Sequence, residues 1–83
     1  MELRLTLGRN VRRVRQAQRL TIEALADEAR LSYSYVGELE RGRRNPTLAI
    51  VERLASALKV QPHRLRHSER RIRMRSIVYF QGR

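Results

Sequence analysis

The sequence predicts a small, mainly α-helical domain of five short helices within its first 67 residues. Three observations lead to this fold class. Apolar residues recur three or four positions apart in short segments, which is the spacing of one face of an α-helix. Threonine or serine stands directly before most of these segments, where a side-chain oxygen can cap a helix. Prolines at positions 46 and 62 fall between segments, because a helix does not continue through them.

The first two predicted helices each follow a threonine. Thr6 is the expected N-cap of a helix from about residue 7 to residue 18, whose inward residues are Leu7, Val11 and Val14. Thr21 is the expected N-cap of a second helix, which carries its apolar side chains at Ile22, Leu25, Ala26 and Ala29.

The third predicted helix begins after Ser32, turns Val36 and Leu39 inward and ends before Pro46. Only about three residues, 30 to 32, connect it to the second helix. A connection this short favours the crossing of a helix-turn-helix pair. Gly37 is unexpected inside this helix, because glycine in a helix interior costs about 1 kcal/mol relative to alanine.

The last two predicted helices complete an apolar core. Thr47 caps a fourth helix, which is expected to bury Leu48, Val51, Leu54, Ala55 and Leu58. Pro62 suits the first turn of a short fifth helix, which carries Leu65 inward.

The charge of the chain favours a polyanionic partner. Nineteen Lys and Arg residues stand against eight Asp and Glu, a net charge of +11, whereas small domains typically carry a magnitude of about 2 to 8. Residues 1–62 contribute 12 − 7 = +5 and residues 63–83 contribute 7 − 1 = +6. Nucleic acid is the first expected partner and an acidic membrane surface the second, with solubility alone as the other explanation.

Several function classes find no support in the residues. There is no cysteine, no secretory segment and no apolar run of membrane-spanning length, so we expect a cytoplasmic, nucleoid-associated protein without a membrane role. No phosphate-binding loop, metal-nuclease carboxylate pair or nucleophile triad is visible, so we expect no enzymatic activity. His63 and His67 have a spacing that suits metal ligands, but no further ligand lies nearby, and we expect neither a metal nor a cofactor.

The run LTIEALADEARLSYSYVGELERGRRNPTLAIVERLASALKVQP resembles the Cro and phage-repressor class of helix-turn-helix proteins, the xenobiotic-response-element (XRE) family. The resemblance covers about residues 7 to 65, and the matching parts occur in the order of the family. It implies a five-helix, lambda-repressor-like domain whose third helix faces the major groove of double-stranded DNA. It also implies a structural ion pair between Arg15 and Glu40 behind that recognition helix.

By the same resemblance, the outward face of the third helix reads base edges through Tyr33, Ser34, Gly37 and Glu38. Glu38 is an acceptor that suits the N4 amine of cytosine, and the alternative is a surface ion pair with Arg41 or Arg43. Gly37 would let the helix backbone approach the DNA closely. The residues expected at phosphates, which position the protein without reading sequence, are Thr21, Tyr35, Arg43, Arg44 and Asn45. For Tyr35, packing in the core is equally expected.

The chain also departs from the family pattern at three positions. Ile22 stands where the family usually has a glutamine that reaches a phosphate, so that contact is lost. Arg19 and Arg30 stand where a glycine commonly ends a helix in the left-handed conformation. Either these turns differ, or positive charge near phosphates offsets the strain.

Residues 68–83 form a basic C-terminal arm outside the helix-turn-helix domain of residues 1–67. Its apolar residues alternate in ERRIRMRSIVYFQG, which predicts a strand used in dimerisation through Ile72, Met74, Val78 and Phe80. Residues 2–5 also alternate and predict a short N-terminal strand, so the two could pair within one subunit or between subunits. Tyr-Phe-Gln-Gly resembles the end of a protease site found in expression vectors, so a vector origin for the last few residues is the alternative.

These features predict a homodimeric, sequence-specific DNA-binding transcriptional regulator that represses by occupying an inverted-repeat operator. The alternative is the antitoxin of a toxin-antitoxin pair, in which the same domain binds DNA and the C-terminal arm binds a toxin protein.

Overall fold

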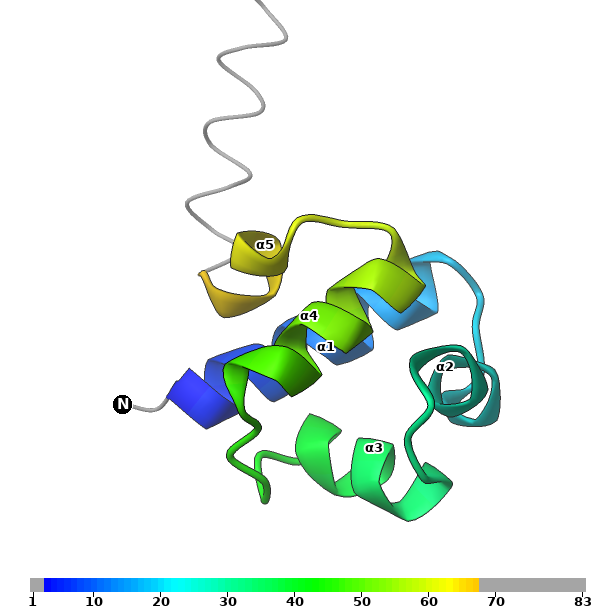
Figure 1. Cartoon of the computed structure of the whole chain (residues 1–83), viewed down its shortest axis with the longest axis horizontal. Coiled ribbons are helices and arrows are strands. Elements are labelled where there is room, and N and C mark those ends of the chain that lie inside the picture. Colours follow the sequence, from blue (N-terminus) through cyan, green and yellow to red (C-terminus); the bar gives the residue numbers. More distant parts are fainter. Residues whose placement is uncertain (1–2, 68–83) are drawn as a thin grey trace, which may run out of the picture.

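The computed structural model describes residues 3–67, which form five α-helices joined by short turns (Figure 1). In chain order the helices are α1 (Leu3–Ala17), α2 (Ile22–Ala29), α3 (Tyr33–Glu40), α4 (Leu48–Leu58) and α5 (Pro62–Arg66). Residues 3–67 contain no strand, so the predicted mainly α fold of five helices is confirmed. None of these helices has the length and apolar character needed to cross a membrane.

Side-chain caps begin three of the helices at the predicted residues. Thr21, Ser32 and Thr47 have extended backbone conformations, and each side-chain oxygen accepts a hydrogen bond from the backbone N–H three residues later, at 3.0, 3.0 and 3.2 Å. Each contact satisfies one of the N–H groups that the first turn of a helix leaves without a partner. Local sequence therefore determines where α2, α3 and α4 start.

The N-terminal prediction was wrong. Residues 3–5, expected in a strand, form the first turn of α1, and Thr6 lies inside that helix instead of capping it. Leu3, Leu5 and Leu7 alternate, but Leu3 and Leu7 are also one helical turn apart, so the same residues fit both periods. The helix satisfies its own backbone hydrogen bonds, whereas a strand would need a partner. The predicted strand in the C-terminal arm lies outside the described residues.

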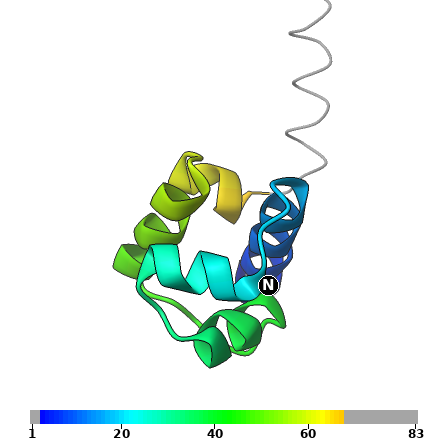
Figure 2. The same ribbon diagram turned by 90° about the vertical axis from the view of Figure 1, so that its right-hand side faces the viewer.

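The core is formed by one apolar stripe from each helix. The buried apolar residues are Leu7, Val11, Leu25, Ala26, Ala29, Val36, Leu39, Val51, Leu54, Ala55, Leu58 and Leu65. Figure 2 shows α1 and α4 on opposite sides of this core, with α5 at one end and α2 and α3 together at the other. Leu48 was predicted to be buried, but it is 58% exposed. It is the first residue of α4 and lies beyond the stripe that α4 turns inward.

Two residues of α1 that the sequence patterns did not single out fix its position. Gly8 is buried against the end of α3, and a Cβ there would lie 2.3 Å from the Leu39 carbonyl oxygen. Asn10 is also buried, and its Nδ2 donates hydrogen bonds to the carbonyl oxygens of Leu65 (2.9 Å) and His67 (2.6 Å). α1 therefore contacts α3 through Gly8 and holds the end of α5 through Asn10.

The turns after α1, α2 and α4 each contain a non-glycine residue in the left-handed conformation. These residues are Arg19, Arg30 and Lys59, with φ of 60–61°. Arg19 and Arg30 thus adopt the conformation that glycine would have there, at some cost in conformational energy. At the end of α2, Arg53 from α4 offsets part of this cost, because its guanidinium donates to the carbonyl oxygens of Ala29 (3.1 Å) and Arg30 (2.6 Å).

Candidate nucleic-acid interface

The recognition helix predicted from the sequence is α3, which lies at the end of the molecule away from α5 (Figures 1 and 2). Val36 and Leu39 point into the core with no exposed surface. Tyr33 and Ser34 are exposed on the outward side, and Tyr33 keeps 59% of its surface accessible. A helix anchored by two apolar residues thus presents polar side chains to the outside.

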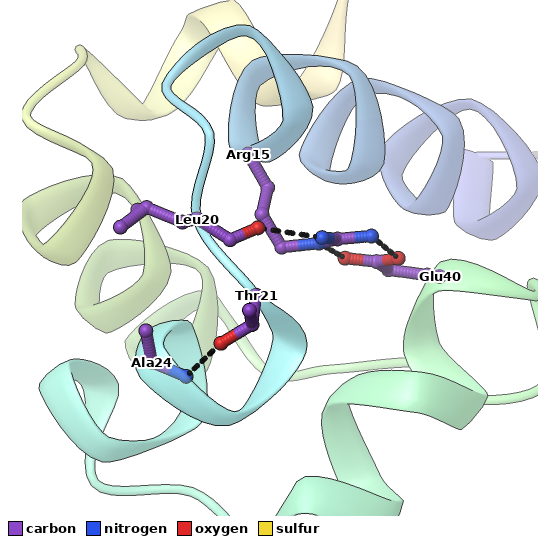
Figure 3. A network of polar contacts seen from close by, with 5 residues as sticks. All are labelled: Arg15, Leu20, Thr21, Ala24 and Glu40. Carbon is purple, nitrogen blue, oxygen red and sulfur yellow. Dashed lines mark hydrogen bonds and ion pairs between the residues drawn. The ribbon is translucent and has the colours of Figure 1, made fainter.

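An ion pair holds α3 from behind, as Figure 3 shows. Arg15 of α1 donates from Nε to Glu40 Oε2 (2.7 Å) and from Nη2 to Glu40 Oε1 (3.1 Å). Its Nη1 donates to the Leu20 carbonyl oxygen (2.7 Å), in the turn that precedes α2. The two side chains are only 11% and 5% exposed. One guanidinium therefore fixes the end of α3 relative to the start of α2.

The residues expected at the start of α2 lie close to this pair. Thr21 caps α2, and its oxygen accepts from the Ala24 N–H (Figure 3). Its hydroxyl can still donate a hydrogen bond. Together with Tyr33, Thr21 lines an open depression of about 470 Å³ between the starts of α2 and α3. Glu23 lines the same depression and places a negative charge in the first turn of α2. The depression brings a predicted phosphate ligand and a predicted base reader to one surface.

Gly37 was expected on the outward face of α3, but it is buried in the free domain, although packing within the described residues does not require a glycine there. A Cβ at this position would meet one atom within 4 Å, Arg41 Nη1, at an ordinary contact distance of 3.7 Å. This contrasts with Gly8, where a Cβ would collide with backbone oxygens. Hence the absence of a side chain at Gly37 has no explanation in the free domain.

Glu38, Arg44 and Tyr35 form a cluster on the outer surface of α3 and the following loop. Glu38 Oε1 accepts a hydrogen bond from Arg44 Nε (2.8 Å), with 37% and 51% of the two side chains exposed. The Arg44 guanidinium also lies over the Tyr35 ring, 5.3 Å from its centroid. Glu38 thus forms a surface ion pair, with Arg44 instead of the expected Arg41 or Arg43. Tyr35 is half-buried and packs against the core as well.

The loop after α3 carries the other predicted phosphate ligands. Arg43 and Asn45 are exposed, and the Arg43 N–H donates to the Glu38 carbonyl oxygen at 2.9 Å. Gly42 has φ of +76°, and a Cβ there would lie 2.3 Å from Leu5 Cδ2. Leu5, which was expected in a strand, therefore packs against this loop from α1.

The other residues that the sequence analysis singled out lie outside α3 and the loop that follows it. The proposed dimerisation residues Ile72, Met74, Val78 and Phe80 are outside the described residues. His67 Nδ1 lies 2.8 Å from the carbonyl oxygen of His63, and the two rings meet edge to face. Within residues 3–67, no group of three or more His, Cys, Asp or Glu side chains is placed to hold a metal ion.

Known helix-turn-helix proteins resemble this chain in sequence. The model of the helix-turn-helix family matches residues 11–65. The immunity repressor protein of Bacillus phage phi105 is 40% identical over 57 residues, which are 69% of this chain and 40% of that protein. An uncharacterised HTH-type transcriptional regulator of Sinorhizobium fredii, y4dJ, is 42% identical over 60 residues, 72% of this chain and 78% of that protein.

A solved structure resembles this chain in both fold and sequence. The restriction-modification controller protein C.AhdI from Aeromonas hydrophila superposes with a TM-score of 0.73 at 40% identity, over 75% of this chain and 94% of that one. The chain thus spans nearly all of the controller protein but less than half of the phage repressor.

Proposed function

The chain belongs to the helix-turn-helix family of DNA-binding transcriptional regulators, and we propose that it represses transcription by binding an inverted-repeat operator as a homodimer. The observation that carries this proposal is the orientation of α3. The Arg15–Glu40 pair and two buried apolar residues hold the helix, while Tyr33 and Ser34 face outward without partners in the core. A rigid helix with an exposed polar face is what reading of the major groove requires.

Arg43 and Thr21, which lie beside α3, supply contacts to the DNA backbone. Arg43 is exposed in the loop that follows the helix, and Thr21 offers a hydroxyl hydrogen near the start of α2. Contacts of this kind to phosphates would fix the register of α3 in the groove. The net charge of +11 strengthens the same interaction at longer range.

The limited length of α3 supports the proposed homodimer. One helix of eight residues reads only a few base pairs, so specificity requires two copies whose recognition helices enter successive major grooves about 34–36 Å apart. The C-terminal arm is the proposed contact between subunits. Because residues 3–5 are helical, pairing of the arm with an N-terminal strand is no longer available. Pairing between the arms of two subunits is therefore the form we propose.

Repression is supported by the immunity repressor among the relatives, and it requires no catalytic or cofactor-binding group. We propose on this basis a non-enzymatic protein that works on chromosomal or phage DNA in the cell.

Selection of bound duplexes from random DNA tests the proposal directly. We expect enrichment of a twofold-symmetric sequence, with half-sites one helical turn apart, and a complex of two chains per duplex by sedimentation. Enrichment of no sequence, or a single half-site bound by one chain, would refute it.

A further inference from the structure

Arg44 differs from Arg43, the residue before it, in how its side chain is held. Its Nε donates to Glu38 Oε1, and its guanidinium lies over the ring of Tyr35. Both neighbours belong to α3. We propose that Arg44 reads a guanine in the major groove, with Glu38 and Tyr35 as the residues that position it. The inference rests on the proposed sequence-specific binding of duplex DNA.

The geometry of the guanidinium fits this role. Within residues 3–67, the hydrogen bond from Nε to Glu38 is the one that the Arg44 side chain makes, so Nη1 and Nη2 have no protein acceptor. These two groups are the fork that donates to O6 and N7 of guanine. A planar cation held on one edge by a carboxylate and placed over an aromatic ring, 5.3 Å from the ring centroid, loses less conformational freedom when it binds a base.

Charge argues against a role at phosphates for this arginine. A carboxylate beside an arginine weakens the attraction of that arginine to a phosphate, because the pair together carries no net charge. Glu38 alone on the outward face would repel the DNA, whereas Glu38 paired with Arg44 does not. Arg43 makes no side-chain hydrogen bond or ion pair with the described residues, so its charge is fully available for phosphate.

The backbone of the loop keeps Arg44 beside α3. The Gly42 N–H donates to the Leu39 carbonyl oxygen (3.0 Å) and the Arg43 N–H donates to the Glu38 carbonyl oxygen (2.9 Å). The loop therefore folds back over the last turn of α3 before Arg44 begins. Half of the Arg44 side chain is exposed, so its guanidinium is open to a ligand that approaches α3 from outside.

Selection of bound sequences with Arg44→Lys tests the inference, with Arg43→Lys as the matched control. Lysine keeps the charge but lacks the planar fork, so a phosphate contact survives the change whereas a two-pronged guanine contact is weakened. We expect Arg44→Lys to lose the preference for one guanine in each half-site by about 5- to 150-fold, with an unchanged salt dependence. The Arg43→Lys variant should keep the sequence preference of the wild type.

Glu38 is tested as a positioning residue by Glu38→Ala and Glu38→Gln. The alanine variant should lose preference for the same guanine as Arg44→Lys. A variant that combines Glu38→Ala with Arg44→Lys should lose no more of that preference than Arg44→Lys alone. The glutamine variant should retain most of the preference, because its amide oxygen still accepts from Nε. Circular dichroism checks that each variant keeps the helical fold.

The outcomes separate this inference from the proposed function. A wild-type protein that enriches no sequence overturns both. A clear consensus without guanine in the half-site, or one that Arg44→Lys leaves unchanged, overturns the guanine contact alone. Stronger binding of Glu38→Ala to all sequences alike would show that Glu38 acts only as a repulsive charge.

Discussion

Replacing Gly37 with alanine should raise the stability of the free protein and weaken its binding to DNA. A methyl group at this position meets one neighbour, the Arg41 Nη1 atom at 3.7 Å, which is the mobile end of an exposed side chain. No backbone atom has to move. The substitution therefore acts on the free protein mainly through helix propensity.

The size of the stability gain follows from that propensity. Alanine is favoured over glycine in a helix interior by about 1 kcal/mol. For a domain of 60–100 residues, 1 kcal/mol raises the melting temperature by roughly 4–8 °C. The loss in DNA affinity has a separate origin, since a methyl group at the closest approach would hold α3 away from the bases. We expect a cost similar to that of one mismatched base pair, about 1–3 kcal/mol.

The control is the same substitution at Gly8. There a Cβ would lie 2.3 Å from the Leu39 carbonyl oxygen and 2.9 Å from that of Glu40, so α1 would have to move away from α3. Overpacking of this kind costs typically about 1–3 kcal/mol, and the middle of that range is about twice the gain in helix propensity. Gly8→Ala should therefore lower the melting temperature.

Thermal unfolding followed by circular dichroism and binding to the selected operator by fluorescence anisotropy measure both effects. A lower melting temperature for Gly37→Ala would refute the claim that the free domain has room for the methyl group. Undiminished operator affinity would refute the close approach of α3 to DNA at Gly37.

Three other predictions concern stability, salt dependence and assembly. Arg15→Ala should lower the free energy of unfolding by about 3–5 kcal/mol, because it leaves Glu40 buried without a partner, and a stability equal to that of Arg43→Ala would contradict this. Operator affinity should fall by about 10³- to 10⁵-fold between roughly 50 and 200 mM salt for a dimer that contacts about 6–10 phosphates, and a flat response would exclude such contacts. Deletion of residues 68–83 should keep the helical spectrum but weaken dimerisation in sedimentation, and an unchanged dimer would show that the helices alone form the interface.

Local patterns predicted most of the helices because each signal lies within a few residues of its effect. Thr21, Ser32 and Thr47 cap the helices they precede, and the apolar spacing identified the buried faces of α2 to α5 except at Leu48. The N-terminus was mispredicted because its three leucines satisfy two periods. The helix is favoured because it satisfies its own backbone hydrogen bonds and because Leu5 packs against Gly42 while Leu7 enters the core.

Contacts between distant parts of the chain could not be predicted in this way. Asn10 bonds to carbonyl oxygens 55 and 57 positions later, and nothing in a single polar residue inside a helix indicates such a partner. Glu38 has three arginines within six positions, so the choice of Arg44 depends on how the loop folds back over α3. The pair of Arg15 and Glu40 was expected only through family resemblance.

The two hydrogen bonds of Asn10 have a mechanical consequence for the assembled regulator. They tie the carbonyl groups at the end of α5 to α1, and α1 rests through Gly8 on the last turn of α3. α1 thus links α3 to residue 67, the last residue before the C-terminal arm. If the arms join two subunits, this link through α1 fixes the distance between the two copies of α3. An Asn10→Ala variant would then keep its affinity for an isolated half-site while tolerating operators whose half-sites are spaced one base pair too near or too far.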